Sequence, residues 1–243
     1  MNSTDRPIPS VRESVSPNHD ARPEGQPVDI LLLHYTGMRS ARESLDRLAD
    51  PAAKVSAHYL IEEDGATWRL VPEGRRAWHA GVAAWDGARD INARSIGIEL
   101  VNPGHEFGYR PFPAPQMRAL ESLALDILAR HPIPPRRVLG HSDVAPLRKA
   151  DPGELFDWAR LARAGIGLWP AGEQVASGEL ADVARMQAGL ARFGYAVPGS
   201  GVLDDETRAV VAAFQRHFRP LRVDGVPDAG TAARLAALLA LID

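Results

Sequence analysis

Residues 28–35 (VDILLLHY) form the segment that most constrains how this chain can fold. Successive side chains of a strand point to opposite faces of a sheet, and here both sets are largely apolar. A strand of that kind is typical of the centre of a sheet that is covered on both sides. The segment therefore predicts a layered α/β domain. Its one imidazole, His34, comes at the carboxyl end, where α/β sheets tend to place ligands.

The segments that follow predict a mixed central sheet flanked by helices. Further strands are expected at residues 56–62, 67–71, 94–101 and 137–139, and helices at residues 40–50, 114–131 and 154–164. The turn at Asp64 and Gly65 is short, so the strands on its two sides are expected to pair as an antiparallel hairpin. In residues 94–101 the apolar side chains share one face, whereas Gly97 and Glu99 point to the other.

Residues 140–153 (GHSDVAPLRKADPG) carry three chemically active side chains, those of His141, Lys149 and Asp151. Glycine and proline oppose a continuous helix, so these groups are expected on a shaped loop. Two imidazoles and one carboxylate, from His34, His141 and Asp151, make a donor set that suits a catalytic zinc ion. From spacing alone the alternative stays open, because a strand histidine is more often a core residue and no HExxH motif is present.

The two ends of the chain differ in composition from its middle. Residues 1–27 are polar and rich in proline, so they are expected to form a flexible arm. Residues 171–178 are expected to be a linker, and residues 179–243, rich in alanine and leucine, a second, small all-α domain of three helices. A short repeat lies within that tail, where glycine, aspartate and threonine recur with one spacing at Gly201, Asp204 and Thr207 and at Gly225, Asp228 and Thr231. Each aspartate is expected to cap a helix.

Charge and composition exclude several classes of partner. The net charge of −3, without a long basic run, predicts no nucleic-acid partner. The chain has no cysteine, so a metal must be held by His, Asp or Glu. No apolar run approaches the ~18 residues of a membrane span, and we expect a monomer.

Five segments occur in an order that indicates a family: LLLHYT, SAHYLIEEDG, RAWHAG, NARSIGIELVN and GHSDVAPLRKADPG. Over residues 28–169 they resemble the amidase-2 family of zinc N-acetylmuramoyl-L-alanine amidases, which includes the AmpD and AmiD amidases, T7-type phage lysozymes and the peptidoglycan recognition proteins. The tail, with LDDETRAVVAAFQRHF, resembles a type-1 peptidoglycan-binding domain. The two-domain arrangement is most similar to the AmiD branch. The resemblance implies a catalytic domain over residues 28–170. It would hydrolyse the amide between N-acetylmuramic acid, or its 1,6-anhydro form, and L-alanine.

The resemblance also implies a role for particular residues. His34, His141 and Asp151 match the zinc ligands of the family. Glu99 matches the acidic residue that activates water, and Lys149 matches the cation that stabilises the oxyanion. The expected site is therefore a zinc ion with an acid and a cation beside it.

Other matches are less specific. Tyr59 matches a position where some relatives carry a catalytic tyrosine, and core packing is the alternative. Trp78, His79 and Asn92 match positions of the substrate cleft. Asp143 is expected to form a turn rather than to support the site.

Three questions stay open in the sequence. The first alternative to an enzyme is a non-catalytic peptidoglycan receptor, although such relatives typically lose a zinc ligand that is present here. The absence of an apolar h-region favours the cytoplasm, with soluble anhydro-muropeptides as substrate, whereas the tail favours the periplasm or the cell wall. Residues 1–170 are expected to fold alone with the tail as a wall tether. In the alternative, the tail packs on the catalytic domain and forms a wall of its cleft.

Overall fold

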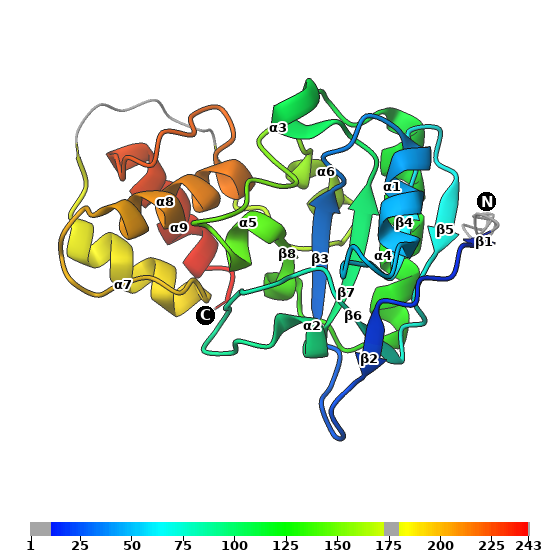
Figure 1. Cartoon of the computed structure of the whole chain (residues 1–243). Coiled ribbons are helices and arrows are strands. Elements are labelled where there is room, and N and C mark those ends of the chain that lie inside the picture. The colour runs from blue at the N-terminus through cyan, green and yellow to red at the C-terminus, as the bar shows by residue number, and fades with distance from the viewer. Residues whose placement is uncertain (1–10, 173–179, 243) are drawn as a thin grey trace, which may run out of the picture.

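The protein is represented by a computed structural model that describes residues 11–172 and 180–242. Within these residues six strands form a central sheet in the order β1-β5-β4-β7-β3-β8 (Figure 1). Their bounds are β1 Arg12–Glu13, β3 Ile30–Tyr35, β4 Tyr59–Ile61, β5 Thr67–Arg69, β7 Ser95–Leu100 and β8 Val138–Gly140. Outside this sheet, β2 (His19–Ala21) pairs antiparallel with β6 (Arg75–Ala77).

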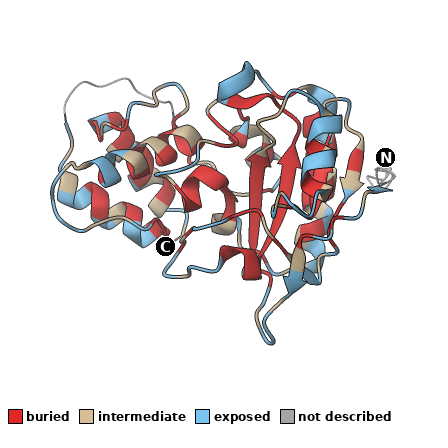
Figure 2. Ribbon diagram, viewed as in Figure 1, coloured by how far each residue is buried: buried red, intermediate tan, exposed pale blue. Residues whose placement is uncertain are grey.

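The register of β3 brings two site residues together. β3 is parallel to both of its neighbours, β7 and β8, and it is buried along its length, as its apolar sequence predicts (Figure 2). His34 of β3 pairs with Glu99 of β7, so their side chains leave the same face of the sheet. The hairpin expected around Asp64 and Gly65 is also present, because β4 and β5 pair antiparallel.

One face of the sheet is covered by α4 (Ala114–Arg130). Its buried apolar residues recur at helical spacing and pack on the side chains that β3 and β7 present to that face. Pro115 lies in the first turn, where its missing N–H costs no helical hydrogen bond. The helix ends at Arg130, close to the boundary expected from the sequence.

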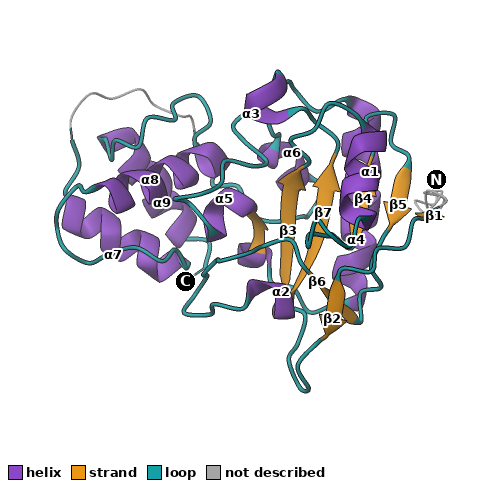
Figure 3. Cartoon of the chain, viewed as in Figure 1, coloured by secondary structure: helices purple, strands orange, loops and turns teal. Residues whose placement is uncertain are grey.

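The other face has two coverings, and the candidate site lies between them. α1 (Ala41–Ala49) packs Leu48 against Leu60 and Val101, and Ser40 caps this helix by accepting the N–H of Glu43. The C-terminal helices cover the part of this face near β3 and β8 (Figure 3). The shorter helices are α2 Ile91–Arg94, α3 Gly104–Phe107, α5 His141–Val144, α6 Trp158–Arg163 and the 3₁₀ turn η1 Pro135–Arg137.

Within residues 180–242, three helices form the tail: α7 (Val183–Phe193), α8 (Asp205–Phe218) and α9 (Ala229–Leu239). Both aspartates of the repeat cap a helix as expected, since Asp204 accepts the N–H of Thr207 and Asp228 that of Thr231. A buried glutamine also recurs: the side chains of Gln187 and Gln215 each bond the turn that precedes the following helix.

The tail shares one hydrophobic core with the sheet. Ile30, Leu32 and Leu139 of the sheet belong to the same buried cluster as Leu190, Phe193, Val211 and Phe214 of the helices. Arg234 of α9 donates to the carbonyl of Pro170. The tail is therefore packed on the sheet, which is one part of the second expected arrangement. The other part is not found, because no described residue of α7–α9 lines the cleft beside His34. The expected linker over residues 173–178 lies outside the described residues.

The expectation of a flexible arm over residues 1–27 is wrong for residues 11–27. Ser16 and Asn18 are buried, and β1 and β2 pair with strands of the body. Arg22 donates to four backbone carbonyl groups, those of Glu73, Asn92, Ala93 and Ser95. This order comes from polar bonds to backbone, which a hydrophobicity pattern does not reveal. Residues 1–10 lie outside the described part.

Two helix predictions also need correction. The helix expected at residues 154–164 begins only at Trp158, because Asp157 caps it by accepting the N–H of Arg160. The loop expected at residues 140–153 contains the short helix α5. Within the described residues, no helix combines the length and the apolar run that crossing a membrane requires.

Candidate active site

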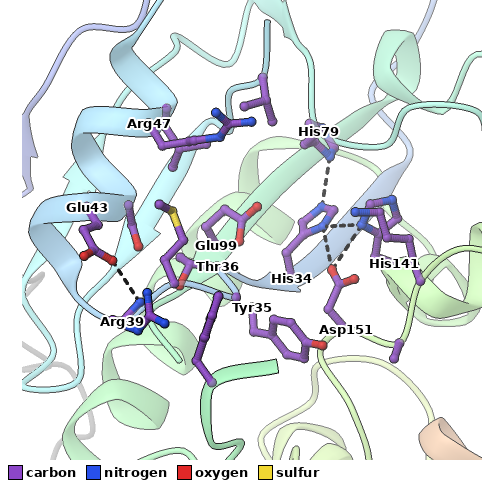
Figure 4. Close-up of a pocket in the computed structure, with 18 of the residues that line it drawn as sticks. His34, Tyr35, Thr36, Arg39, Glu43, Arg47, His79, Glu99, His141 and Asp151 are labelled. Carbon is purple, nitrogen blue, oxygen red and sulfur yellow. Dashed lines mark hydrogen bonds and ion pairs between the residues drawn. The ribbon is translucent and has the colours of Figure 1, made fainter. Parts of the chain in front are cut away.

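Three side chains from separate segments meet at the carboxyl end of β3 (Figure 4). His34 lies near the end of β3, His141 begins α5, and Asp151 follows in the next loop. The Nδ1 atoms of His34 and His141 are 3.0 Å apart, and each is 3.1 Å from Oδ2 of Asp151. All three residues are buried. The structure thus brings together the three ligands that the resemblance implies.

In each histidine, the hydrogen bond of Nε2 shows that Nδ1 is the atom that faces Asp151. Nε2 of His141 lies 3.0 Å from the carbonyl oxygen of Ala80. A carbonyl oxygen only accepts, so Nε2 carries the proton and donates, which leaves a lone pair on Nδ1. Hydrogen bonds of this kind orient the histidine ligands of metal sites.

A chain of three bonds fixes His34 in the same way. The hydroxyl of Ser95 donates to the carbonyl of Ile91 at 2.6 Å, so its oxygen is free to accept from Nε2 of His79 at 3.3 Å. Nδ1 of His79 then accepts from Nε2 of His34 at 3.1 Å. Burial lowers the pKa of His79 well below 6.5 and, with the neighbouring His141, lowers the pKa of His34 to about 4. Both rings are therefore neutral at pH 7.

The resulting donor set fits a metal cation. Three acceptor atoms face one another at 3.0–3.1 Å, which is unfavourable unless a cation lies between them. A triangle of this size leaves a point about 2.0–2.1 Å from every corner, the usual length of Zn–N and Zn–O bonds. Burial acts to raise the pKa of Asp151, but the two imidazoles outweigh it and hold the pKa below the usual range.

Glu99 lies beside this group with an unused oxygen. Its Oε2 atom is buried and has no hydrogen-bond partner within the part of the chain that the structure describes. Burial, followed by the charge of Asp151, raises the pKa of Glu99 well above 4.5, while Lys149 opposes the rise. A buried carboxyl without a partner, facing a cleft, is a candidate for proton transfer.

The site opens into a cleft of about 750 Å³. His34, His141 and Asp151 lie at one end, and α1 with the segment before it lies along the other, with Glu99 between the two (Figure 4). Positive charge is abundant on the lining: Arg39, Arg47, Arg148 and Lys149. The cleft therefore suits a ligand that carries carboxylates.

Comparison with known families settles what kind of chain this is. The N-acetylmuramoyl-L-alanine amidase family matches residues 24–154. The chain belongs to this family. A second family, described as a peptidoglycan binding domain, matches residues 179–235 of the amidase.

Relatives support the assignment over almost the whole length. AmiD of Escherichia coli is 42% identical over 231 residues, which cover 87% of the amidase and 82% of AmiD. The structure of E. coli AmiD with anhydro-N-acetylmuramic acid-L-Ala-D-gamma-Glu-L-Lys matches with a TM-score of 0.81 and 41% identity over 90% of this chain and 91% of that one. AmpDh3 of Pseudomonas aeruginosa in complex with anhydromuramic pentapeptide matches with a TM-score of 0.79 and 34% identity over 100% and 99% of the two chains. The amidase is thus a hydrolase, and its fold is the expected α/β fold.

The AmpD relatives match about three fifths of the amidase. AmpD of Haemophilus influenzae is 35% identical over 171 residues, which cover 63% of this chain and 91% of AmpD. These relatives thus cover a smaller share of the amidase than AmiD does.

Of the three residues expected to contact substrate, His79 lines the cleft, whereas Asn92 and Trp78 do not. The side-chain oxygen of Asn92 accepts the backbone N–H groups of His79 and Ala80 at 3.1 and 2.8 Å, so it holds the segment behind the site. The indole of Trp78 donates to Asp20 at 2.7 Å. Direct contact of Asn92 and Trp78 with substrate stays a prediction.

Tyr59 lies on the opposite face of the sheet from the metal ligands. In the register of β4 and β7, Leu60 pairs with Glu99, and Tyr59 pairs with Ile98. The ring of Tyr59 packs in the core below α4, and its hydroxyl donates to Glu73 at 2.7 Å. The catalytic interpretation of Tyr59 is wrong, and the packing alternative holds.

Sequence reasoning missed or misread several supporting residues. Ser95 and Gly97 carry no signal that separates them from ordinary strand residues, yet Ser95 ends the bond chain from His34 and Gly97 lies under the ring of His79. Asp143 was expected only to form a turn, but it is buried and bonded by residues of the tail.

Proposed function

We propose that this amidase uses zinc to hydrolyse the amide bond between the lactyl group of N-acetylmuramic acid and L-alanine. The observation that carries the proposal is the buried triangle of Nδ1, Nδ1 and Oδ2 atoms from His34, His141 and Asp151, with an unpartnered Glu99 beside it. Two imidazoles, one carboxylate and no thiolate suit Zn²⁺ with an open coordination position.

The metal and the acid have separate tasks in this proposal. A bound Zn²⁺ lowers the pKa of water and polarises the amide carbonyl. Glu99 takes the proton of the attacking water and returns it to the leaving nitrogen. Burial raises the pKa of Glu99, and a carboxylate with a raised pKa is a stronger base toward water than an ordinary one. The strand position of Glu99 aims the carboxyl at the cleft.

Cations on the cleft lining act on the substrate. Lys149 is exposed and lines the cleft beside Asp151, so it can face the oxygen of the amide carbonyl as negative charge develops there. The ligand in the E. coli AmiD structure contains a γ-linked glutamate, whose α-carboxylate is free. Arg39 and Arg47, on the α1 side, are placed to bind such a carboxylate.

We infer that soluble anhydro-muropeptides are the substrate, because the two long relatives were seen with such molecules bound. Polymeric wall stays the alternative, favoured by the match of the tail to a peptidoglycan binding domain. The receptor alternative has no support, since the site keeps every group that the reaction needs. We expect the chain to act as a monomer, which sedimentation velocity tests.

The proposal is tested by product analysis with and without metal. The full chain is incubated with a 1,6-anhydro-N-acetylmuramyl tripeptide and, separately, with intact sacculi, and released peptide is identified by mass spectrometry. Chelation should abolish release and Zn²⁺ should restore it, while the fold survives because the core is large. Glu99→Ala should keep its zinc and lose about 10²–10⁴-fold in kcat.

Two results would contradict the proposal. One is full activity in protein shown by elemental analysis to contain no metal. The other is normal turnover by Glu99→Ala. If Glu99→Ala instead binds no zinc, the assignment of Glu99 as a non-ligand is wrong.

A further inference from the structure

Besides their shared hydrophobic core, the tail and the catalytic domain meet at a buried carboxylate, that of Asp143. Asp143 lies in α5, two residues after the ligand His141, and it is 1% exposed. Figure 1 shows α5 between the sheet and α8 of the tail. The groups that contact Asp143 therefore influence the position of α5, the helix that carries His141.

Three donors bond this carboxylate, and two of them belong to the tail. The backbone N–H of Gly140 donates to Oδ2 at 2.7 Å, which ties Asp143 to the residue just before His141. The hydroxyl of Tyr195 donates to Oδ1 at 2.6 Å, and Nδ1 of His217 donates to Oδ2 at 2.7 Å. A buried carboxylate is costly unless its oxygens are bonded, so α5 keeps this position only with both tail residues in place.

The two tail donors are themselves held by packing. The ring of His217 is stacked between Trp158 and Phe218, with centroid distances of 3.7 and 3.8 Å. The ring of Tyr195 packs edge-on against Trp85 at 4.8 Å. Burial, with the charge of Asp143, raises the pKa of Tyr195, so its hydroxyl stays protonated and continues to donate. Rigid donors of this kind define one position for the carboxylate.

A second contact from the tail reaches the other side of His141. The carbonyl that accepts from Nε2 of His141 belongs to Ala80. The short loop that follows Ala80 is hydrogen-bonded both to α5 and to the tail. The N–H of Ala84 donates to Val144 of α5 at 2.8 Å, and the N–H of Asp86 donates to Gly194 of the tail at 2.7 Å. The tail thus contacts both segments that orient this ligand.

We propose that the helical tail positions His141, and that Tyr195 and His217 are positioning residues that act through Asp143. This inference rests on the proposed metal-dependent amidase function. It gives the tail a role in the chemistry itself, in addition to any affinity for the wall. No residue of α7–α9 lines the cleft within the described residues, so the effect passes through α5 rather than through contact with substrate.

The experiment removes one donor at a time in the full chain. Tyr195→Phe keeps the ring and loses the hydroxyl. His217→Leu loses the donor, whereas His217→Asn also loses the ring but keeps an N–H near the place of Nδ1. Zn²⁺ affinity is measured by competition with a chelator, and kcat and KM are measured on the anhydro-muropeptide.

The expected result is a loss at the metal and in turnover. Tyr195→Phe and His217→Leu should each weaken Zn²⁺ affinity by about 10–100-fold and lower kcat, with KM nearly unchanged. His217→Asn should recover most of the loss. The double variant should lose less than the product of the two single effects, because both donors serve one carboxylate.

Gln187→Ala serves as the matched control. It removes buried bonds to the turn at Val202 and the hydroxyl of Thr207, so it destabilises the tail without touching Asp143. Its Zn²⁺ affinity should equal that of the wild type. Thermal unfolding identifies the folded variants, and Tyr195→Phe, which keeps its packing, decides the matter if His217→Leu does not fold.

The inference is overturned if folded Tyr195→Phe binds Zn²⁺ and turns over like the wild type. It is also overturned if Gln187→Ala loses as much Zn²⁺ affinity as Tyr195→Phe, since a general destabilisation would then explain both. A wild-type chain without Zn²⁺ affinity or amidase activity would overturn the proposed function, and this inference with it.

Discussion

Gly97→Ala should disturb the metal site through the ring of His79. Gly97 lies on the site face of β7, and a Cβ atom there would be 2.6 Å from Cγ and Nδ1 of His79 and 2.7 Å from Cε1. Non-bonded carbon atoms normally lie about 3.5–4.0 Å apart, so the ring must move by about 1 Å. The strand cannot yield easily, because Gly97 pairs with Leu32 of β3 in the middle of the sheet.

The expected losses of stability and of metal affinity follow from the two hydrogen bonds that the ring of His79 makes. A shift of that size breaks or bends the contact of Nδ1 with His34, now 3.1 Å, and that of Nε2 with Ser95, now 3.3 Å. Overpacking of a core by one methyl group costs about 1–3 kcal/mol in the free energy of unfolding. Loss of the partner that orients a metal-bound histidine typically weakens metal affinity by about 10–100-fold.

The assay combines denaturant unfolding of zinc-free protein with chelator competition for Zn²⁺. Gly74→Ala is the matched control, because a Cβ atom there meets nothing within 4 Å. In a His79→Ala background the added methyl at position 97 no longer meets a ring, so most of its cost should disappear. The reasoning is refuted if Gly97→Ala stays within about 0.5 kcal/mol of Gly74→Ala and keeps the Zn²⁺ affinity of the wild type.

Three further outcomes are expected. Lys149→Ala should keep zinc and lose about 10²–10³-fold in kcat, and unchanged kcat in a zinc-loaded variant would remove Lys149 from the reaction. Tyr59→Phe should leave kcat unchanged and lower the free energy of unfolding by about 1 kcal/mol, because only its bond to Glu73 is lost; a large fall in kcat would contradict its placement below α4. Burial raises the pKa of Glu73, but hydrogen bonds from Arg130, His131 and Tyr59 outweigh it and lower the pKa to about 2. The carboxylate of Glu73 therefore adds stability that is present above pH 4.5 and lost as the pH falls toward 2. Zinc-free Glu73→Gln should lack about 1–2 kcal/mol of that stability in denaturant unfolding, and identical pH profiles for the two proteins would refute the assignment.

Much of the catalytic architecture was predictable because it depends on local pattern. The apolar run around β3 predicts burial on both faces, and alternation along β7 places Gly97 and Glu99 away from the apolar face. Helix caps at Asp204 and Asp228 follow from side-chain chemistry within three residues. The residue types suggested the ligand set, but only the resemblance favoured it over core histidines, since no short motif contains it.

Features that depend on register or on distant partners were not predictable. Alternation along β4 separates Tyr59 from Leu60, but only the pairing of β4 with β7 decides which of them shares a face with Glu99. Residues 11–27 are ordered by polar side chains that bond remote backbone groups, such as Ser16 with Leu48. Composition alone predicts that such polar residues are solvated, because it contains no information on the distant backbone groups that they bond.

The sequence, through its resemblance to a known family, predicted a two-part α/β amidase with a metal, an acid and a cation at one site. Only the tertiary structure decided that the two parts share a core and that Asp143 joins them. The donors to Asp143 come from Tyr195 and His217, which are 52 and 74 residues away along the chain. These hydrogen bonds form only when α5, α8 and the sheet are packed, because the groups that bond a buried carboxylate come from separate elements.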